Sequence, residues 1–346
     1  MKIAVLTSGG VDSSVALRLL HQAGHELKAF YLKIWLEDEL SYLGECPWEE
    51  DLSYVRQICD EIGVSLEVVP MQKEYWERVV QYTVTEAKAG RTPNPDVLCN
   101  QQIKFGQFYE VIGDDFEKVA TGHYAQVKET DKGFILKRAP DSVKDQTYFL
   151  AQIGHEQLAR AMFPIGTYNK EEVRRLAQEF NLPNQDRKDS QGICFLGKIP
   201  FQEFLKHHLG ENPGDFVNVE SGEKVGEHLG YWFYTIGQRN GLGLSGGPWF
   251  VVKKDIEKNV IYLARGYEPD AVYKNEFEVG SVHLINPDWR QIEGGLQVKI
   301  RHGAAMHECR VEGQKVILKE PVHGVAAGQF AVFYDEDVCL GSAVII

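Results

Sequence analysis

The sequence predicts an α/β domain built on a parallel sheet, followed by a small central domain and a C-terminal β-barrel-like domain. Three observations support this fold class. Short apolar strands alternate with amphipathic helices through the first third of the chain, an order typical of a parallel sheet covered on both faces. From about residue 213, short strands are separated by Gly, Pro and Asn, as in small sandwiches and barrels. A break in this pattern near 267–277 divides the β-rich part in two.

The individual elements are expected in the following order. The first part should contain strands at 2–7, 26–32, 65–70 and 117–122 and helices at 11–23, 49–62, 73–89 and 101–112. A hairpin at 124–138 and helices near 155–162, 170–180 and 201–209 follow. We therefore expect three domains, at 1–205, 206–272 and 273–346.

Composition narrows the class of protein. A chain of 346 residues with 43% hydrophobic residues can bury sizeable cores. Its apolar runs are shorter than the roughly 18 residues of a spanning helix, and the first apolar run is too short for a secretion signal. We therefore expect a cytoplasmic protein without a membrane partner. The six cysteines form no C-x-x-C pair, so we predict no metal site and expect any important cysteine to act through its reactivity.

The stretch LTSGGVDSS, residues 6–14, joins the first strand to the first helix. A glycine-rich turn before a helix presents amide N–H groups to an anion, and the helix dipole adds positive character. The carboxyl ends of parallel strands are where such sheets bind ligands, and Gly122 ends another strand there.

Two other glycine motifs are weaker candidates for a phosphate-binding loop. GICFLGK (192–198) lacks the Ser or Thr of a Walker loop, and GLGLSG (241–246) lies among β segments.

The SGGVDSS turn, which lacks a Walker lysine, resembles that of the PP-loop ATP pyrophosphatases, whose fold is adenine nucleotide alpha hydrolase-like. Within that family the chain resembles the tRNA-specific 2-thiouridylases. The matching stretches are RTPNPDVLCNQQIKFG (91–106), ATGHYA (120–125), KDQTYFL (144–150), DRKDSQGICFLG (186–197) and YTIGQRNGLGL (234–244). They follow the family's order over most of the first 245 residues.

This resemblance implies an enzyme that adenylates the 2-carbonyl oxygen of a wobble uridine and replaces it with sulfur, releasing AMP and pyrophosphate. The implied cofactor is ATP with Mg²⁺. The implied partners are tRNA, of the Glu, Gln and Lys acceptors, and a persulfide donor such as a cysteine desulfurase or sulfur carrier. A formal charge of −13 argues against a nucleic-acid partner unless one face of the protein is basic.

The resemblance also implies roles for individual residues. The expected ATP contacts are Thr7, Ser8, Gly9, Gly10, Val11, Asp12, Ser13, Ser14, Leu32 and Gly122. The expected tRNA contacts are Asn94, Pro95, Asp96, Lys144, Asp145, Gln146, Arg301 and His302. His123 is either a site residue or a strand-end histidine.

Sulfur transfer requires a nucleophilic sulfur that does not leak away, and therefore a persulfide on one cysteine and a second thiol to release it. By resemblance, Cys194 carries the persulfide and Cys99 ends in a disulfide with it. Both lie in segments expected to be loops. Asp96, three residues before Cys99, is either an acid or base near the uracil ring or a turn cap after Pro95.

Two other functions are weighed against this one. Another PP-loop enzyme that amidates or ligates its substrate would need neither Cys99 nor Cys194. A tRNA-binding protein without catalytic activity would release no pyrophosphate.

Overall fold

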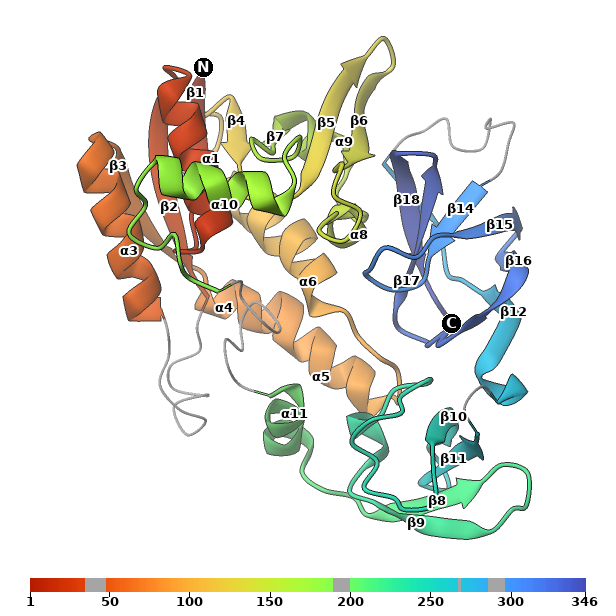
Figure 1. The fold of residues 1–346 in the computed structure, drawn as a ribbon. Coiled ribbons are helices and arrows are strands. Elements are labelled where there is room, and N and C mark those ends of the chain that lie inside the picture. Colours follow the sequence, from red (N-terminus) through yellow and green to blue (C-terminus); the bar gives the residue numbers. More distant parts are fainter. Residues whose placement is uncertain (35–47, 189–199, 267–268, 286–295) are drawn as a thin grey trace.

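A five-stranded parallel sheet organises the first part of the chain (Figure 1). The computed structural model describes residues 1–34, 48–188, 200–266, 269–285 and 296–346. The strand order is β3-β2-β1-β4-β7. The strands are β1 (Lys2–Leu6), β2 (Glu26–Lys33), β3 (Ser65–Pro70), β4 (Lys118–Ala120) and the short β7 (Ala161–Met162), which the sequence analysis assigned to a helix.

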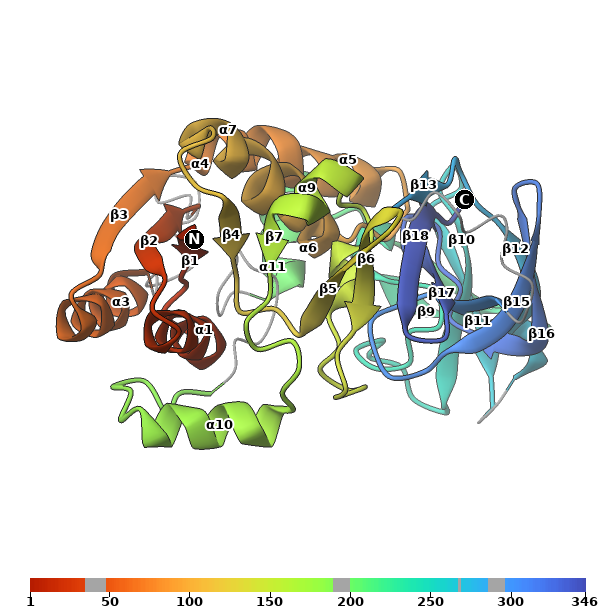
Figure 2. The same ribbon diagram turned by 90° about the horizontal axis from the view of Figure 1, so that it is seen from above.

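Helices cover both faces of this sheet (Figure 2). Side chains of β1 alternate between them: Ile3 and Val5 pack with α1 (Val11–Gln22), α3 (Trp48–Ile62) and α10 (Lys170–Glu179). Ala4 and Leu6 pack on the other side, as the two-residue period of a strand requires. That second layer contains α4 (Gln72–Tyr75), the π-helical η2 (Trp76–Val80), α5 (Gln81–Lys88), α6 (Pro95–Leu98), the π-helical η3 (Cys99–Gln107), α7 (Phe108–Ile112), α8 (Thr147–Leu150), α9 (His155–Arg160) and α11 (Phe201–Leu209).

The central part is a small four-stranded sheet of order β10-β11-β8-β9. Its strands are β8 (Gly214–Asn218), β9 (Lys224–His228), β10 (Trp249–Asp255) and β11 (Val260–Arg265), and a 3₁₀ turn, η4 (Tyr231–Phe233), lies between β9 and β10. Phe216, Tyr234, Val251 and Leu263 form its core. The elements thus match the β-rich segment expected after residue 213.

The C-terminal strands belong to a sheet that continues into the first part of the chain. Cys339 on β18 is paired with Leu136 on β6, so the hairpin β5–β6 is an extension of the C-terminal sheet. The elements are β5 (Ala125–Thr130), β6 (Gly133–Arg138), η5 (Asp270–Val272), β12 (Tyr273–Glu278), β13 (His283–Leu284), β14 (Leu296–Lys299), β15 (His307–Glu312), β16 (Lys315–His323), β17 (Phe330–Asp335) and β18 (Val338–Val344). The first part of the chain and the C-terminal strands therefore share one continuous β-sheet.

Among the described residues, no helix has the length and apolar character that crossing a bilayer requires. The same residues contain no cluster of three or more His, Cys, Asp or Glu side chains suited to a metal ion.

Candidate active site

The glycine-rich turn after β1, residues 7–14, is called the SGG loop below. Hydrogen bonds among its own residues stabilise the conformation of the loop. The N–H of Ser8 donates to Oγ of Ser13 (3.2 Å), and the hydroxyls of Ser13 and Ser14 both donate to the carbonyl of Gly10 (3.0 and 2.9 Å). Gly10 is the N-cap residue of α1 and has no side chain to accept from the first helical amides. An anion can therefore serve as their acceptor.

Two glycines of the predicted ATP site are required by close backbone contacts. Gly9 has a φ of +74°, and a Cβ there would lie 2.5 Å from the carbonyl oxygen of Asp51 in α3. A Cβ at Gly122, just after β4, would lie 2.6 Å from the backbone nitrogen of Ser13. β1 and β4 are neighbours in the sheet, so the two glycines let α3 and the start of α1 pack closely against the backbone at the carboxyl edge of the sheet. Parallel sheets bind their ligands at this edge.

The acidic residue of the SGG loop is held by side chains from two other elements. Nζ of Lys170, the first residue of α10, lies 2.7 and 3.0 Å from the two carboxylate oxygens of Asp12. The Tyr124 hydroxyl donates to Asp12 Oδ1 at 2.9 Å. The side chains of Lys170 and Asp12 are 15% and 30% exposed, so a positive group already lies at the mouth of the loop.

The carbonyl of Gly9 is fixed from the opposite side. Nδ2 of the buried Asn184 donates to it at 2.8 Å, and Nη1 of Arg187 donates at 3.1 Å. Arg187 also forms an ion pair with Asp51. Burial raises the pKa of Asp51, and the guanidinium of Arg187 acts against that shift. Asn184 and Arg187 therefore hold the backbone of the SGG loop, and Arg187 also connects it to α3.

The segment with Asp96 and Cys99 is helical, which corrects the expectation that Cys99 lies in a loop. The helix begins at Pro95, six residues before the expected start at 101, because Asn94 accepts a hydrogen bond from the N–H of Val97 (3.4 Å) as N-cap and Pro95 occupies the first turn. Cys99 begins the π-helical stretch that follows and is 1% exposed. Its thiol is thus buried, whereas Asp96 is half-buried one turn earlier.

His123 lies between this helix and the end of β4. Its Nδ1 lies 2.7 Å from Oγ1 of Thr121, and its ring packs between Phe105 of η3 and Phe163. Burial, followed by the positive charge of Lys104, lowers the pKa of His123 well below its usual value. A neutral, packed histidine therefore connects the end of β4 with the helix that carries Cys99.

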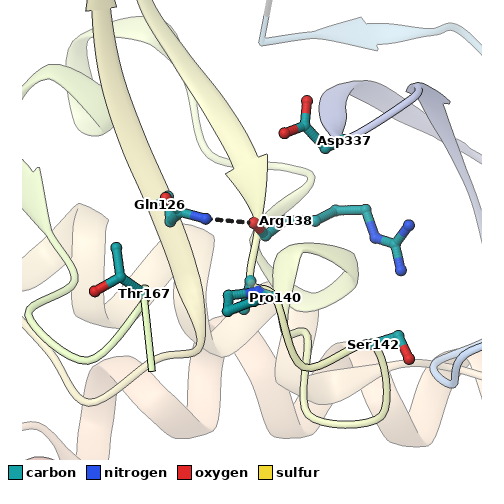
Figure 3. Close-up of a pocket in the computed structure, with 7 residues that line it drawn as sticks. Gln126, Arg138, Pro140, Ser142, Thr167 and Asp337 are labelled. Atoms are coloured by element: carbon teal, nitrogen blue, oxygen red, sulfur yellow. Dashed lines mark hydrogen bonds between the residues drawn. The ribbon is translucent and has the colours of Figure 1, made fainter. Parts of the chain in front are cut away.

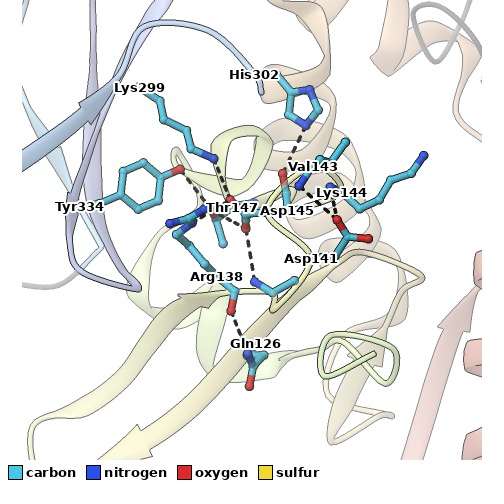
Figure 4. Close-up of polar contacts among 11 residues, drawn as sticks. Gln126, Arg138, Asp141, Val143, Lys144, Asp145, Thr147, Lys299, His302 and Tyr334 are labelled. Atoms are coloured by element: carbon cyan, nitrogen blue, oxygen red, sulfur yellow. Dashed lines mark hydrogen bonds and ion pairs between the residues drawn. The ribbon is translucent and has the colours of Figure 1, made fainter. Parts of the chain in front are cut away.

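Of the three residues Lys144, Asp145 and Gln146, the middle one does not face the surface (Figure 4). The Asp145 carboxylate is buried, with Nζ of the equally buried Lys299 at 2.9 Å and Nε of Arg138 at 3.3 Å. A direct contact of this carboxylate with tRNA is therefore not available in this structure. The Gln146 side chain accepts from the N–H of Tyr124 at 2.9 Å, while the Lys144 side chain extends away from the cluster in Figure 4.

His302 joins the same cluster from the C-terminal domain. Its Nε2 lies 3.2 Å from the carbonyl oxygen of Asp145, and its ring stacks on Phe149 with centroids 4.6 Å apart. The residue as a whole is exposed. Loss of solvent around the imidazole ring nevertheless lowers the pKa of His302, and the hydrogen bond with Asp145 and the negative charge of Asp96 act against this shift. Arg301, the residue before His302, is exposed.

The remaining predicted residues are less informative. Leu32 is half-buried near the carboxyl end of β2 and packs on the main core. Cys194, predicted to carry the persulfide, lies outside the described residues.

An open hollow of about 500 Å³ (Figure 3) lies where hairpin β5–β6 meets Asp337, beside Arg138 and Thr167. None of its lining residues belongs to the predicted site, and the chemistry above makes the SGG loop the better candidate.

Sequence reasoning missed several residues that shape the site. Lys170, Tyr124 and Asn184 contact the SGG loop from elements far along the chain. The capping box formed by Asn169 and Glu172 signals the start of α10, but nothing in the local sequence indicates that the lysine between them reaches Asp12.

Comparison with known proteins decides between the remaining interpretations. Residues 1–198 match the family model described as the tRNA methyl transferase HUP domain. Residues 202–265 match its PRC-barrel domain, and residues 274–345 match an aminomethyltransferase beta-barrel domain. The tRNA-specific 2-thiouridylase MnmA of Parabacteroides distasonis is 47% identical over 355 residues, which cover 100% of this chain and 99% of that protein. The chain belongs to the tRNA-specific 2-thiouridylase family.

MnmA 1 of Bacteroides thetaiotaomicron is 48% identical over 356 residues, covering 100% of this chain and 99% of that protein. The domain models carry a methyl transferase description, whereas the 2-thiouridylases match the chain over its full length and across all three domains. The resemblance to the 2-thiouridylases, the fold class and the prediction of an enzyme are confirmed. Among solved structures, the U34-tRNA thiolase NcsA from Methanococcus maripaludis is 17% identical, with a TM-score of 0.36 over 59% of this chain and 64% of that one, too distant to support an argument.

Proposed function

We propose that this 2-thiouridylase uses ATP to activate the 2-carbonyl oxygen of the wobble uridine in tRNA and replaces that oxygen with sulfur. The observation that carries the proposal is the similarity to tRNA-specific 2-thiouridylases over the whole chain. The SGG loop supports it, because the first amides of α1 have no side-chain cap and can donate to a phosphate at the carboxyl edge of the sheet. The enzyme would act in the cytoplasm, on the Glu, Gln and Lys acceptors.

In this proposal the SGG loop binds the ATP phosphates, with Mg²⁺ arriving on the nucleotide. The loop amides and Lys170 stabilise negative charge on the phosphates while the uracil oxygen attacks the α-phosphate and pyrophosphate leaves. Oxide is a poor leaving group, whereas AMP is a good one. The wobble base must be lifted from its stack to reach this site, and Asn94, Pro95 and Asp96 are proposed to hold it.

The sulfur step requires two thiols and a balanced exchange of electrons. The persulfide on Cys194 comes from an external persulfide donor. The Cys99 thiolate attacks Sγ of Cys194, a disulfide forms, and hydrosulfide leaves; hydrosulfide then attacks C2 of the activated base and expels AMP. The Cys99 sulfur is oxidised as the outer sulfur of the persulfide is reduced, and a cellular thiol reductant must then reduce the disulfide to restore both cysteines. The burial of Cys99 keeps competing oxidants and water away from its thiol.

The residues proposed to contact tRNA divide between two domains. Asp145, between Lys144 and Gln146 in residues 1–205, contacts His302 and Lys299 of residues 273–346, and the buried pair of Asp145 and Lys299 fixes the two segments to each other. We therefore propose that Asp145 orients this surface and does not contact the nucleic acid. The central domain, 206–272, would add further contacts with the tRNA.

Mass analysis of nucleosides tests this function. Purified enzyme with tRNA, ATP, Mg²⁺ and a persulfide donor should produce 2-thiouridine. Cys99→Ser and Cys194→Ser should each abolish it, and only Cys194→Ser should also prevent persulfide loading. Cys309→Ser, a half-buried cysteine of the C-terminal sheet, is the matched control. Normal thiolation by Cys99→Ser would contradict the two-cysteine step.

A further inference from the structure

The segment just before α6 is bound to the C-terminal domain by its backbone. The N–H of Thr92 donates to the carbonyl oxygen of Ala327 at 2.7 Å. Gly328, with a φ of +90°, lies so close that a Cβ there would be 2.9 Å from the backbone nitrogen of Thr92. This contact joins two parts of the chain far apart in sequence, and the approach requires a glycine.

The side-chain amide of the next residue, Gln329, forms hydrogen bonds with the same segment through both its nitrogen and its oxygen. Its Nε2 donates to the carbonyl oxygens of Thr92 (3.0 Å) and Pro93 (3.2 Å). Its Oε1 accepts from Nδ2 of Asn94 (3.4 Å) and from the hydroxyl of the buried Tyr148 (3.3 Å). A primary amide has two N–H donors and one oxygen with two lone pairs. Both N–H donors of Gln329 are therefore used on the backbone of 92–93, and its oxygen faces Asn94 and the Tyr148 hydroxyl, which also lies 3.1 Å from the carbonyl oxygen of Phe330.

Asn94 connects the Gln329 contact to α6, the helix that carries Asp96 and leads to Cys99. Asn94 Nδ2 faces Gln329, so Asn94 Oδ1 points the other way and caps α6 through the N–H of Val97. The capped turn carries Asp96, and Cys99 follows one turn later. An amide that fixes Asn94 therefore also fixes the direction in which α6 begins.

We propose that Gln329 is a positioning residue of the thiolation site: its amide orients Asn94 and the backbone of 92–93, so the C-terminal domain sets the geometry of Asp96 and Cys99. The inference rests on the proposed function. It assigns to the C-terminal domain a part in the chemical step in addition to holding tRNA.

Gln329→Glu is the decisive variant, because it keeps the shape of the side chain while replacing both N–H donors with an oxygen that faces two carbonyls. Gln314→Glu makes the same chemical change at an exposed turn of the same domain and is the control. At saturating tRNA we expect the single-turnover thiolation rate of Gln329→Glu to fall about tenfold to a hundredfold. The Kd values for tRNA and ATP should stay within about threefold, and Gln314→Glu should behave as wild type.

Two further measurements separate positioning from general destabilisation. Hydrogen exchange over residues 92–98 should accelerate in Gln329→Glu and not in Gln314→Glu. In an Asn94→Ala background the additional effect of Gln329→Glu on rate should shrink, because the two act in series. A wild-type rate, or the same fractional loss in both backgrounds, would overturn the proposal. A wild-type enzyme that does not thiolate tRNA would overturn the proposed function instead, and hydrogen exchange would still decide the Gln329 contact.

Discussion

The ammonium group of Lys170 lies 2.7 Å from a carboxylate oxygen of Asp12, although 158 residues separate the two in sequence. α10 begins at Lys170 and packs against α1, which begins next to Asp12. The fold therefore places one positive side chain at the mouth of the SGG loop, where the phosphates of a nucleotide are expected to bind.

Lys170→Met should weaken ATP binding. Losing one charge-assisted hydrogen bond to a phosphate costs about 1.5–3 kcal/mol, so the Kd for ATP should rise roughly tenfold to a hundredfold while the Kd for tRNA is unchanged. Titration calorimetry with each ligand measures both. Arg175→Met, on the exposed side of the same helix, should bind ATP as wild type does. Unchanged ATP affinity in Lys170→Met would remove this residue from the nucleotide site.

Lys299→Met should destabilise the interface between the first and last domains. Lys299 and Asp145 are both fully buried, and removing one partner of a buried pair costs about 3–5 kcal/mol. We expect the lower end of that range because Arg138 still faces Asp145. Urea unfolding followed by circular dichroism measures the loss. Lys319→Met, which removes an exposed ion pair with Glu308, should have little effect. Equal stability of the two variants would mean that the buried pair does not hold the domains together.

The stability of the protein should fall below about pH 6.5, where His123 is protonated in the unfolded chain but stays neutral in the folded one. Burial and Lys104 lower the pKa of His123 in the folded state, so below pH 6.5 the unfolded chain binds a proton that the folded chain does not. This contribution is therefore complete above about pH 6.5 and is lost as the pH falls toward the folded-state pKa. His123→Phe, which fits among Phe105 and Phe163, removes it. Denaturant unfolding of both proteins from pH 8 to pH 5 should give a wild-type-minus-variant difference that shrinks with acid, by at most about 1.4 kcal/mol per pH unit. A constant difference would mean that His123 is not held neutral.

The parts of this structure that were predictable from sequence depend on local signals. The SGG loop follows a strand and precedes a helix, so its place at the carboxyl edge of the sheet follows from the order of elements alone. The early start of the helix that leads to Cys99 is also encoded locally, since Asn94 and Pro95 are an N-cap and first-turn pair. The expectation of a loop at Cys99 is therefore wrong for a reason that the sequence contains.

The rest depends on contacts between distant residues. Asp145 belongs to a motif that the resemblance assigns to tRNA, yet its burial is set by Lys299, 154 residues away. Gln329 lies 235 residues from Asn94, and no period or motif connects them. β7 consists of two residues, too few to produce an alternating pattern. Such features follow from tertiary packing and cannot be derived from one sequence read locally.

The fate of the uracil oxygen tests the central claim most directly. A tRNA whose wobble uridine carries a heavy oxygen isotope at the 2-carbonyl is incubated with the enzyme, ATP, Mg²⁺ and a persulfide donor, and the products are analysed by mass spectrometry. If the base is adenylated at that oxygen, each 2-thiouridine formed is matched by one AMP that carries the isotope and one unlabelled pyrophosphate. Formation of ADP and phosphate, or 2-thiouridine accompanied by unlabelled AMP, would contradict the account.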